Sequence, residues 1–374
     1  MTLTCRAFAA LAFVLAVSGS VVAQTGDDRR AWPRTDFGRR TVEWNEILSG
    51  GPPKDGIPAI DRPRFVSPKD ARNWLKDREP VIVLRLGAEA RAYPLQILMY
   101  HEIVNDTVVG TPVAVTFCPL CNAAIAFDRQ VGGRELDFGT TGRLRFSDLV
   151  MYDRQTESWW QQFSGEAIVG RYAGEKLRAL PAEIAAFGDF AAAYPAGKVL
   201  SRETGYNRPY GRNPYAGYDR IDQSPFLFRE RVDDRLPPME RVLAVGSRGK
   251  VRLYPFQILR GKTVIPGDLD SLPYVVFVKD GMASALDAER VETGREIPAA
   301  TAFDRRIDGK VLEFSHRGGA WMDKNTGSRW NLFGEAVAGS LAGQRLLPVS
   351  GGVHFAFAWL AFNPDSEIVR TLSR

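Results

Sequence analysis

The sequence predicts a predominantly β protein of the α+β class, made of two diverged tandem copies of one β-rich unit with short flanking helices. Alternating apolar stretches broken by Gly-rich turns predict strands. Motifs that recur in the same order in both halves of the chain predict the duplication. The hydrophobic share of 45% and the charged share of 25% are typical of a globular protein.

Residues 1–23 are interpreted as a secretory signal peptide. An apolar stretch follows Arg6, and Val21 and Ala23 occupy the small-residue positions before a cleavage site. This stretch is shorter than the ~20 apolar residues that span a bilayer, so we expect no transmembrane anchor. The mature protein is expected in the periplasm or outside the cell after cleavage near Ala23.

Four segments are expected after the signal peptide. They are an N-terminal extended segment at 24–65, repeat unit one at 66–203, a Tyr/Pro/Gly/Asn-rich connecting loop at 204–240, and repeat unit two, a degenerate copy, at 241–374. The net charge of +5 is interspersed along the chain without a basic run. A nucleic-acid partner is therefore not expected.

The elements of the first unit follow from local signals. Ser67 as N-cap, Pro68 in the first position and Asp70 in the first turn predict a helix. The other elements expected here are a strand at 81–86, a short helix beginning at Pro94, a strand at 111–117 and an Ala/Phe-rich helix at about 182–194.

Recurring motifs predict the same elements in the second unit. The matched pairs are 92–98 with 253–259, 126–129 with 302–305, and 153–167 with 323–336. The expected elements are a strand at 241–245, a short helix beginning at Pro255 and an Ala/Phe-rich helix at about 353–362.

The connecting loop contains four tyrosines between Gly205 and Tyr218, punctuated by Gly, Pro and Asn. Loops of this length without secondary structure are often functional. We expect that it either packs across the two units or lines a binding cleft.

Cys118 and Cys121 are the only cysteines after Cys5, which lies in the signal peptide, and they form a Cys-Pro-Leu-Cys motif. A disulfide that closes so short a loop removes little chain entropy, so a bridge that stabilises the fold is a poor explanation for the pair.

The Cys-Pro-Leu-Cys motif has two mechanistic uses. In a metal knuckle, a tight turn between strands points both thiolates at one ion. In a thiol-disulfide centre, one thiolate attacks a partner and the other resolves the mixed disulfide. The β-like flanks favour the knuckle.

His101 is the best candidate for a third ligand because it lies upstream across one predicted hairpin, near the core-facing Ile97. Glu102 is a candidate ligand, an orienting partner of the imidazole or a general base. Met151 is a candidate soft ligand, although a thioether in an apolar stretch is usually a core residue. His316 and His354 are interpreted as structural. Soft thiolate ligands suit copper, zinc and iron, and copper or zinc is expected here.

Comparison of the two copies singles out the same residues. When the copies are aligned on Phe117 and Phe277, Cys118 falls opposite Val278 and Cys121 opposite Gly281. The His101-Glu102 pair falls in the region 261–263 of the second unit, which has no equivalent. The second copy thus lacks all four groups, which indicates that the first copy has them for a reason other than folding.

Several motifs together resemble the bacterial and archaeal family called domain of unknown function 3179. They are the segments 54–60, 92–95, 101–102, 117–122 and 208–218. The resemblance covers nearly the whole mature chain. It implies an exported protein with the Cys-Pro-x-Cys and His-Glu elements and implies no particular reaction.

The leading hypothesis is an exported metal-binding protein, redox-active or not, that uses Cys118, Cys121 and His101 as ligands with Glu102 adjacent. It would have a periplasmic redox or metal-delivery partner. The first alternative is a periplasmic thiol-disulfide oxidoreductase with Cys118 as the nucleophile. The second is a small-ligand or carbohydrate-binding module with a structural Cys118–Cys121 bridge.

Overall fold

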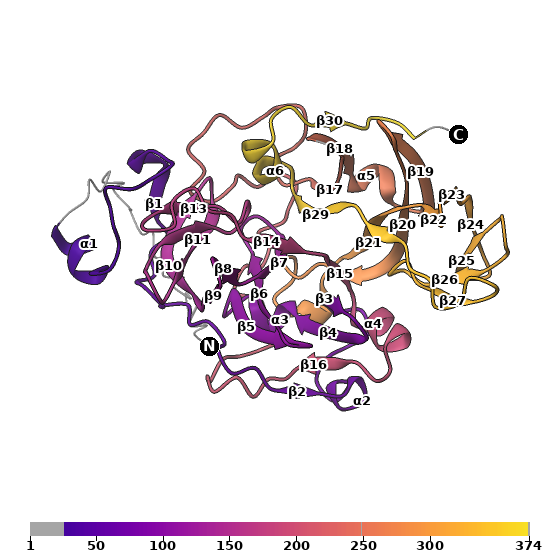
Figure 1. Cartoon of the computed structure of the whole chain (residues 1–374), viewed down its shortest axis with the longest axis horizontal. Helices are drawn as coiled ribbons and strands as arrows, with labels where there is room; N and C mark the ends of the chain where they lie inside the picture. Colours follow the sequence, from indigo (N-terminus) through magenta and orange to yellow (C-terminus); the bar gives the residue numbers. More distant parts are fainter. Residues whose placement is uncertain (1–25, 248, 373–374) are drawn as a thin grey trace, which may run out of the picture.

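A computed structural model describes residues 26–247 and 249–372 (Figure 1). Strands predominate, and the α-helices of the described part are short, the longest having 7 residues. The predicted class, α+β with mostly strands, is confirmed. Among the described residues no helix has the length and apolar character to cross a bilayer. The expected signal peptide at 1–23 lies outside the described residues.

The first half of the chain forms three sheets and a small hairpin. The first sheet has the order β1 (Ile47–Ser49), β10 (Phe138–Arg145), β11 (Asp148–Asp153), β12 (Trp159–Gln161), β13 (Ala167–Val169). The second has the order β14 (Arg178–Leu180), β7 (Ala123–Asp128), β6 (Thr111–Cys118), β5 (Ile103–Val108). The third has the order β15 (Ala182–Ala186), β3 (Pro80–Leu86), β4 (Glu89–Pro94), β16 (Lys198–Leu200), β2 (Phe65–Val66). The hairpin pairs β8 (Gln130–Val131) with β9 (Arg134–Glu135).

The second half repeats this pattern of sheets. Its sheets have the orders β29 (Ser350–Phe355), β17 (Arg241–Ser247), β18 (Lys250–Pro255), β30 (Glu367–Ile368); β19 (Val264–Leu269), β20 (Leu272–Ala283), β21 (Glu296–Asp304), β28 (Leu347–Pro348); and β24 (Phe314–Arg317), β25 (Ala320–Asp323), β26 (Arg329–Trp330), β27 (Ala336–Ala338). The hairpin pairs β22 (Arg306–Ile307) with β23 (Lys310–Val311). The direction of pairing also corresponds between the two halves. In the first half β16 runs parallel to β4, and in the second half β30 runs parallel to β18.

The helices are short and lie between or beside the strands. They are α1 (Gly26–Ala31), α2 (Pro68–Ala71), α3 (Leu95–Leu98), α4 (Phe187–Ala193), α5 (Phe256–Leu259) and α6 (Ala356–Phe362), with 3-10 turns η1 (Trp44–Glu46) and η2 (Val291–Thr293). The expected start of α2 is confirmed, because the Ser67 side chain accepts a hydrogen bond from the Asp70 backbone N–H. Pro94 ends β4 and caps α3, so this helix begins at Leu95 rather than at Pro94.

The two Ala/Phe-rich helices are shorter than expected. Residues 182–186 form strand β15, which pairs in register with β3, and the helix occupies only Phe187–Ala193. In the same way, β29 at Ser350–Phe355 pairs with β17 before α6 begins. Pairing along an existing strand supplies the backbone hydrogen bonds of these residues and overrides the helix preference of Ala.

The two halves share one hydrophobic core. A single cluster of buried apolar residues contains members of both halves, from Ala59 to Leu360. Strand β15 of the first half lies against β21 and β29 of the second half, and β7 also contacts β29 (Figure 1). Residues 201–240, all of them described, contain no helix or strand and connect the halves as an extended loop.

Candidate metal centre

The Cys-Pro-Leu-Cys motif lies in the connection between β6 and β7. Cys118 ends β6 and pairs with Ala123 of β7, so Pro119–Asn122 form the turn. Asn122 has φ +50°, a left-handed conformation that Asn tolerates better than most residues. The predicted turn between two strands is confirmed. Both cysteines are free and fully buried, with 1% and 0% exposure.

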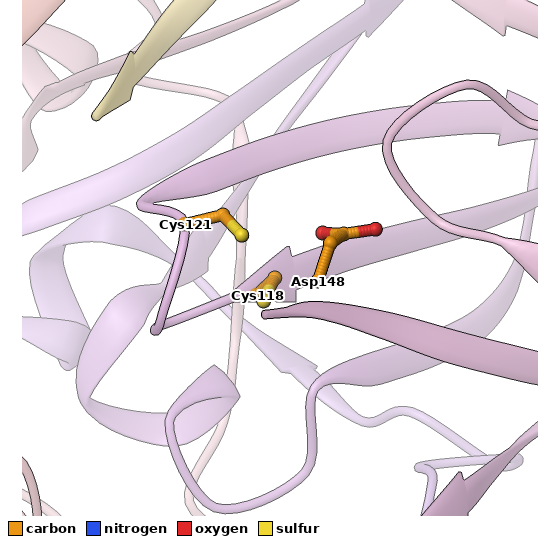
Figure 2. Close-up of side chains that lie close together, drawn as sticks. All are labelled: Cys118, Cys121 and Asp148. Carbon is orange, nitrogen blue, oxygen red and sulfur yellow. The ribbon is translucent and has the colours of Figure 1, made fainter. Parts of the chain in front are cut away.

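Asp148 lies beside the two cysteines. One carboxylate oxygen of Asp148 and the two sulfurs all lie within 4.8 Å of one another, and the three side chains lie close together (Figure 2). We call Cys118, Cys121 and Asp148 the cysteine–aspartate cluster. Within the described part of the chain, this is the one group of His, Cys, Asp or Glu side chains close enough to share a metal ion.

A tight hairpin turn places Asp148 at this position. Arg145 of β10 pairs with Asp148 of β11, which leaves Phe146 and Ser147 as a two-residue turn. Both have positive φ, 54° and 66°, as a type I′ hairpin turn requires. The Ser147 carbonyl accepts a weak hydrogen bond from the Cys118 thiol at 3.9 Å. The turn therefore brings the start of β11 against the end of β6.

The Asp148 carboxylate has one oxygen bound and one unbound. Its Oδ2 accepts hydrogen bonds from Gln161 Nε2 at 2.6 Å and from the Phe163 backbone N–H at 2.9 Å. Its Oδ1 is buried and has no nitrogen or oxygen hydrogen-bond partner among the described residues. Burial raises the pKa of the carboxyl group, and hydrogen bonding with the Cys118 and Cys121 thiols partly opposes this rise. A thiol is a weak donor, so this buried oxygen is poorly satisfied, and a bound cation would remove that cost.

Burial disfavours charge at all three groups of the cluster. It raises the pKa of Asp148 to about 7 and raises the pKa of the Cys118 and Cys121 thiols above their ordinary value. Each group is also close to the others, which adds like-charge repulsion in the ionised state. The cluster is therefore suited either to remain protonated or to release its protons to a metal ion.

The donor set fits a transition-metal ion. Two thiolate sulfurs and one carboxylate oxygen are ligands of the kind zinc uses. The three come from one turn and one neighbouring strand, so no change in the course of the chain is needed to bring them together.

His101 does not belong to the cluster. Its Nδ1 lies 2.7 Å from the Pro58 carbonyl, which can only accept, so Nδ1 carries the hydrogen. Its Nε2 then accepts a hydrogen bond from the Tyr210 hydroxyl at 2.6 Å. Burial lowers the pKa of His101 to about 4, in keeping with a neutral ring. Both nitrogens are thus occupied, and helix α3 ends at Leu98, before the position where a longer helix would have aligned His101 with Ile97.

Glu102 lies near the cluster but is not part of it. It is 7% exposed, and no described residue forms a hydrogen bond with its carboxylate. Burial, followed by the proximity of Asp148, raises the pKa of Glu102 to about 8. Its charge also contributes to the raised pKa of Cys118. Glu102 is therefore positioned for proton transfer or ligand binding beside the cluster.

Met151 is part of the hydrophobic core. It lies in β11 three residues after Asp148, so the two side chains point to opposite faces of the strand. It is fully buried and belongs to the main apolar cluster. The structure thus agrees with the interpretation of its thioether as a packing group.

The pairing of the hairpins corrects the alignment of the two halves by one residue. The β5–β6 turn follows Val108 and the β19–β20 turn follows Leu269, and both hairpins close with a two-residue turn. Counted along these ladders, Cys118 matches Lys279 rather than Val278. The second half still has no cysteine at this position.

The same comparison of the two halves also singles out Asp148, which the sequence analysis did not identify. When Asp153 is matched with Asp323, Asp148 falls opposite Gly318, so this carboxylate is also specific to the first half. Its position about 30 residues after the cysteines gives no local sign that it lies beside them. A hairpin turn brings Asp148 to the cysteines from a later strand.

The connecting loop covers the site. Tyr218 donates a hydrogen bond to the Leu120 carbonyl between the two cysteines at 3.2 Å, and Tyr210 binds His101. On the other side the loop reaches the second half, where the backbone N–H of Asn213 donates to the Glu289 carbonyl at 2.8 Å. The loop thus packs across both halves and also lies over the cysteine turn.

Comparisons with known proteins give one match. The model of a family described as a protein of unknown function (DUF3179) matches residues 54–366, which include both halves, the connecting loop and the cysteine–aspartate cluster. Neither the curated proteins nor the solved structures yield a match.

Proposed function

The chain belongs to the family described as a protein of unknown function (DUF3179), and we propose that it is an exported metal-binding protein whose ion is held by Cys118, Cys121 and Asp148. The observation that carries this proposal is the closeness of two buried thiols to a carboxylate oxygen that has no nitrogen or oxygen partner among the described residues. A divalent cation supplies that partner and stabilises the deprotonated thiols that burial disfavours.

Zinc suits these ligands best. Zinc binds Cys sulfur and Asp oxygen alike, whereas copper(I) prefers soft thiolate or thioether ligands. The exchange of His101 for Asp148 in the proposed ligand set therefore favours zinc, with iron next, over copper. A zinc ion with three protein ligands keeps a fourth position for water or substrate, as catalytic zinc sites do.

We further infer that the two halves are diverged copies and that residues 1–23 direct export. The matching order of sheets in the two halves supports the duplication. The second half lacks counterparts of Cys118, Cys121 and Asp148, so it acts as scaffold for the first.

Thiol-disulfide exchange is a weaker explanation of the cysteine pair. Burial raises the pKa of both thiols, whereas exchange needs a readily formed thiolate. The first cysteine ends a strand rather than beginning a helix, and neither sulfur is exposed to a partner protein. A structural bridge is also disfavoured, because both cysteines are free.

Metal content tests the proposal. Protein purified from the periplasm is compared with the variants Cys118→Ser and Asp148→Asn, after reconstitution with zinc, iron or copper. The wild type is expected to hold a stoichiometric amount of zinc. Each variant is expected to weaken zinc binding by more than the roughly 10- to 100-fold that loss of an outer-shell partner costs.

Two control variants sharpen this test. His101→Asn and Met151→Leu remove the other candidate ligands and are expected to leave zinc content unchanged. A loss of metal in His101→Asn with full retention in Asp148→Asn would show that the ion uses His101 instead. Sub-stoichiometric metal in the wild type under all three reconstitutions would refute metal binding.

A further inference from the structure

A small pocket of about 130 Å³ lies beside the cysteine–aspartate cluster. Leu120, from between the two cysteines, and Leu149, which follows Asp148, form part of its wall. Tyr215 and Phe226 of the connecting loop also line it. Cys118, Cys121 and Asp148 do not line the pocket, so it is a separate space next to the cluster. Most of its wall is apolar.

The acidic group of this pocket is Glu102. The side chain lines the pocket, yet it is 93% buried and has no hydrogen-bond partner among the described residues. Its backbone is held on both sides, since its N–H donates to the Leu98 carbonyl at 2.7 Å and its carbonyl accepts from the Phe117 N–H at 2.8 Å. A largely buried carboxyl group that faces a cavity and has no protein partner favours a ligand in that cavity.

The charges around Glu102 indicate the kind of ligand. No described cation forms an ion pair with it, and the charged neighbour that affects it most is Asp148, which is also acidic. Arg143 lines the pocket as well, but its guanidinium lies over the Trp159 ring, 5.0 Å from the centroid. The described cations thus leave the Glu102 carboxylate without an ion pair.

We propose that this pocket binds a small primary amine whose ammonium group pairs with Glu102 and whose carbon chain packs against the apolar wall. An ammonium group supplies both a positive charge and three hydrogen-bond donors. The rings of Tyr215 and Phe226 add the aromatic surface that favours a cation. A cavity of about 150 Å³ holds a molecule of the size of benzene, so this slightly smaller pocket admits an amine of about three to five carbon atoms.

Calorimetric titration of the full mature chain, free of metal, tests the proposal with n-butylamine as the probe. The expected dissociation constant is about 1 mM or lower, within the binding energy that a ligand with so few atoms can reach. The uncharged probe 1-butanol has the same carbon chain and is expected to bind at least about 10-fold more weakly. The titration is made at pH 9, above the pKa of about 8 of Glu102, so that its carboxyl group is ionised. Glu102→Gln keeps the shape but cannot ionise, so butylamine binding should fall by about 10-fold or more.

A second variant guards against an effect of Glu102→Gln on folding. Leu144→Phe enlarges a residue of the pocket wall without changing the acid, and it should abolish butylamine binding. Equal binding of butylamine and 1-butanol, or undiminished amine binding in Glu102→Gln, would show that the pocket is merely apolar. Failure of the wild type to bind the amine would also overturn the proposal.

Metal content of the same preparations separates this proposal from the preceding one. Wild type and Glu102→Gln are expected to hold equal amounts of zinc after reconstitution. Amine binding that fails while zinc is retained refutes only the amine site. Loss of zinc in Glu102→Gln would make Glu102 a metal ligand and would overturn the amine site instead.

Discussion

At the scale of single residues, the candidate site depends on buried polar groups that lack ordinary partners. Asp148 has a carboxylate oxygen without a nitrogen or oxygen partner among the described residues, and none of these residues forms a hydrogen bond with the Glu102 carboxylate. Both burials are costly for folding alone. His101, by contrast, uses both ring nitrogens in hydrogen bonds and thereby links the first half to the connecting loop.

His354 provides a residue-scale prediction of pH dependence. Its Nε2 donates a hydrogen bond to the Gly351 carbonyl at 2.7 Å. Its ring packs against the rings of Phe163 and Trp359, with centroid separations of 4.8 and 5.0 Å. Burial lowers the pKa of His354 to about 4, below the 6.5 of an ordinary His. The unfolded chain therefore binds a proton that the folded chain does not, and this residue destabilises the fold as pH falls from 6.5 towards 4.

Urea unfolding at pH 7 and pH 4.5 checks this sign. One pKa unit corresponds to about 1.4 kcal/mol. When the pH is lowered from 7 to 4.5, the free energy of unfolding should therefore fall by about 2–3 kcal/mol more in the wild type than in the variant His354→Gln. The comparison between the two proteins removes the contributions of other groups. Identical pH dependence in wild type and variant would contradict a neutral buried His354.

At the scale of elements, hairpin turns decide which side chains meet. The β6–β7 turn orients both thiols, and the type I′ turn between β10 and β11 places Asp148 next to them. Strands such as β3 and β6 follow from apolar sequence and were predicted almost to their ends. The strands β15 and β29 were not predicted, because their Ala- and Gly-containing sequences become strands only through pairing with β3 and β17.

The attachment of the connecting loop is predicted to depend on the Tyr210 hydroxyl. This group donates to His101 and also lies within hydrogen-bond distance of the Thr204 hydroxyl. Tyr210→Phe leaves a buried imidazole nitrogen without a donor and should lower the stability of the loop by about 1–3 kcal/mol. Faster amide hydrogen exchange in residues 204–218, with little change at β3 and β6, is the expected result.

Tyr206→Phe is the matched control for this prediction. Tyr206 is 43% exposed, and within the described residues no hydrogen bond to its hydroxyl is seen. The variant Tyr206→Phe should therefore leave amide hydrogen exchange in the loop unchanged. Equal effects of the two variants would show that the Tyr210 hydroxyl does not hold the loop.

At the scale of the whole molecule, the second half completes the core of the first. The Phe355 backbone N–H donates to the Cys121 carbonyl at 3.0 Å, and Arg85 forms an ion pair with Glu335 at 3.1 Å. One hydrophobic cluster extends through both halves. The second half therefore supports the cysteine turn from outside, although it contributes no side chain to the cysteine–aspartate cluster.

The shared core predicts that the two halves unfold together. Circular dichroism and tryptophan fluorescence should give coincident urea transitions, since both halves contain buried tryptophans. Phe355→Ala removes a fully buried ring between the halves and should lower the free energy of unfolding by about 3–5 kcal/mol without dividing the transition. Two separate transitions in the wild type would indicate that the halves fold independently.

The sequence by itself determined the class of fold, strands such as β3 and β6, and the turn that carries Cys118 and Cys121. These features depend on local patterns of apolar, turn-forming and capping residues. Only the tertiary structure decided which third group joins the cysteines. Strand pairing and a two-residue turn bring Asp148 to the thiols, while hydrogen bonds with Pro58 and Tyr210 occupy both ring nitrogens of His101. Contacts between such distant segments depend on the register of the strands and on the packing of loops. Proximity in the sequence does not determine them.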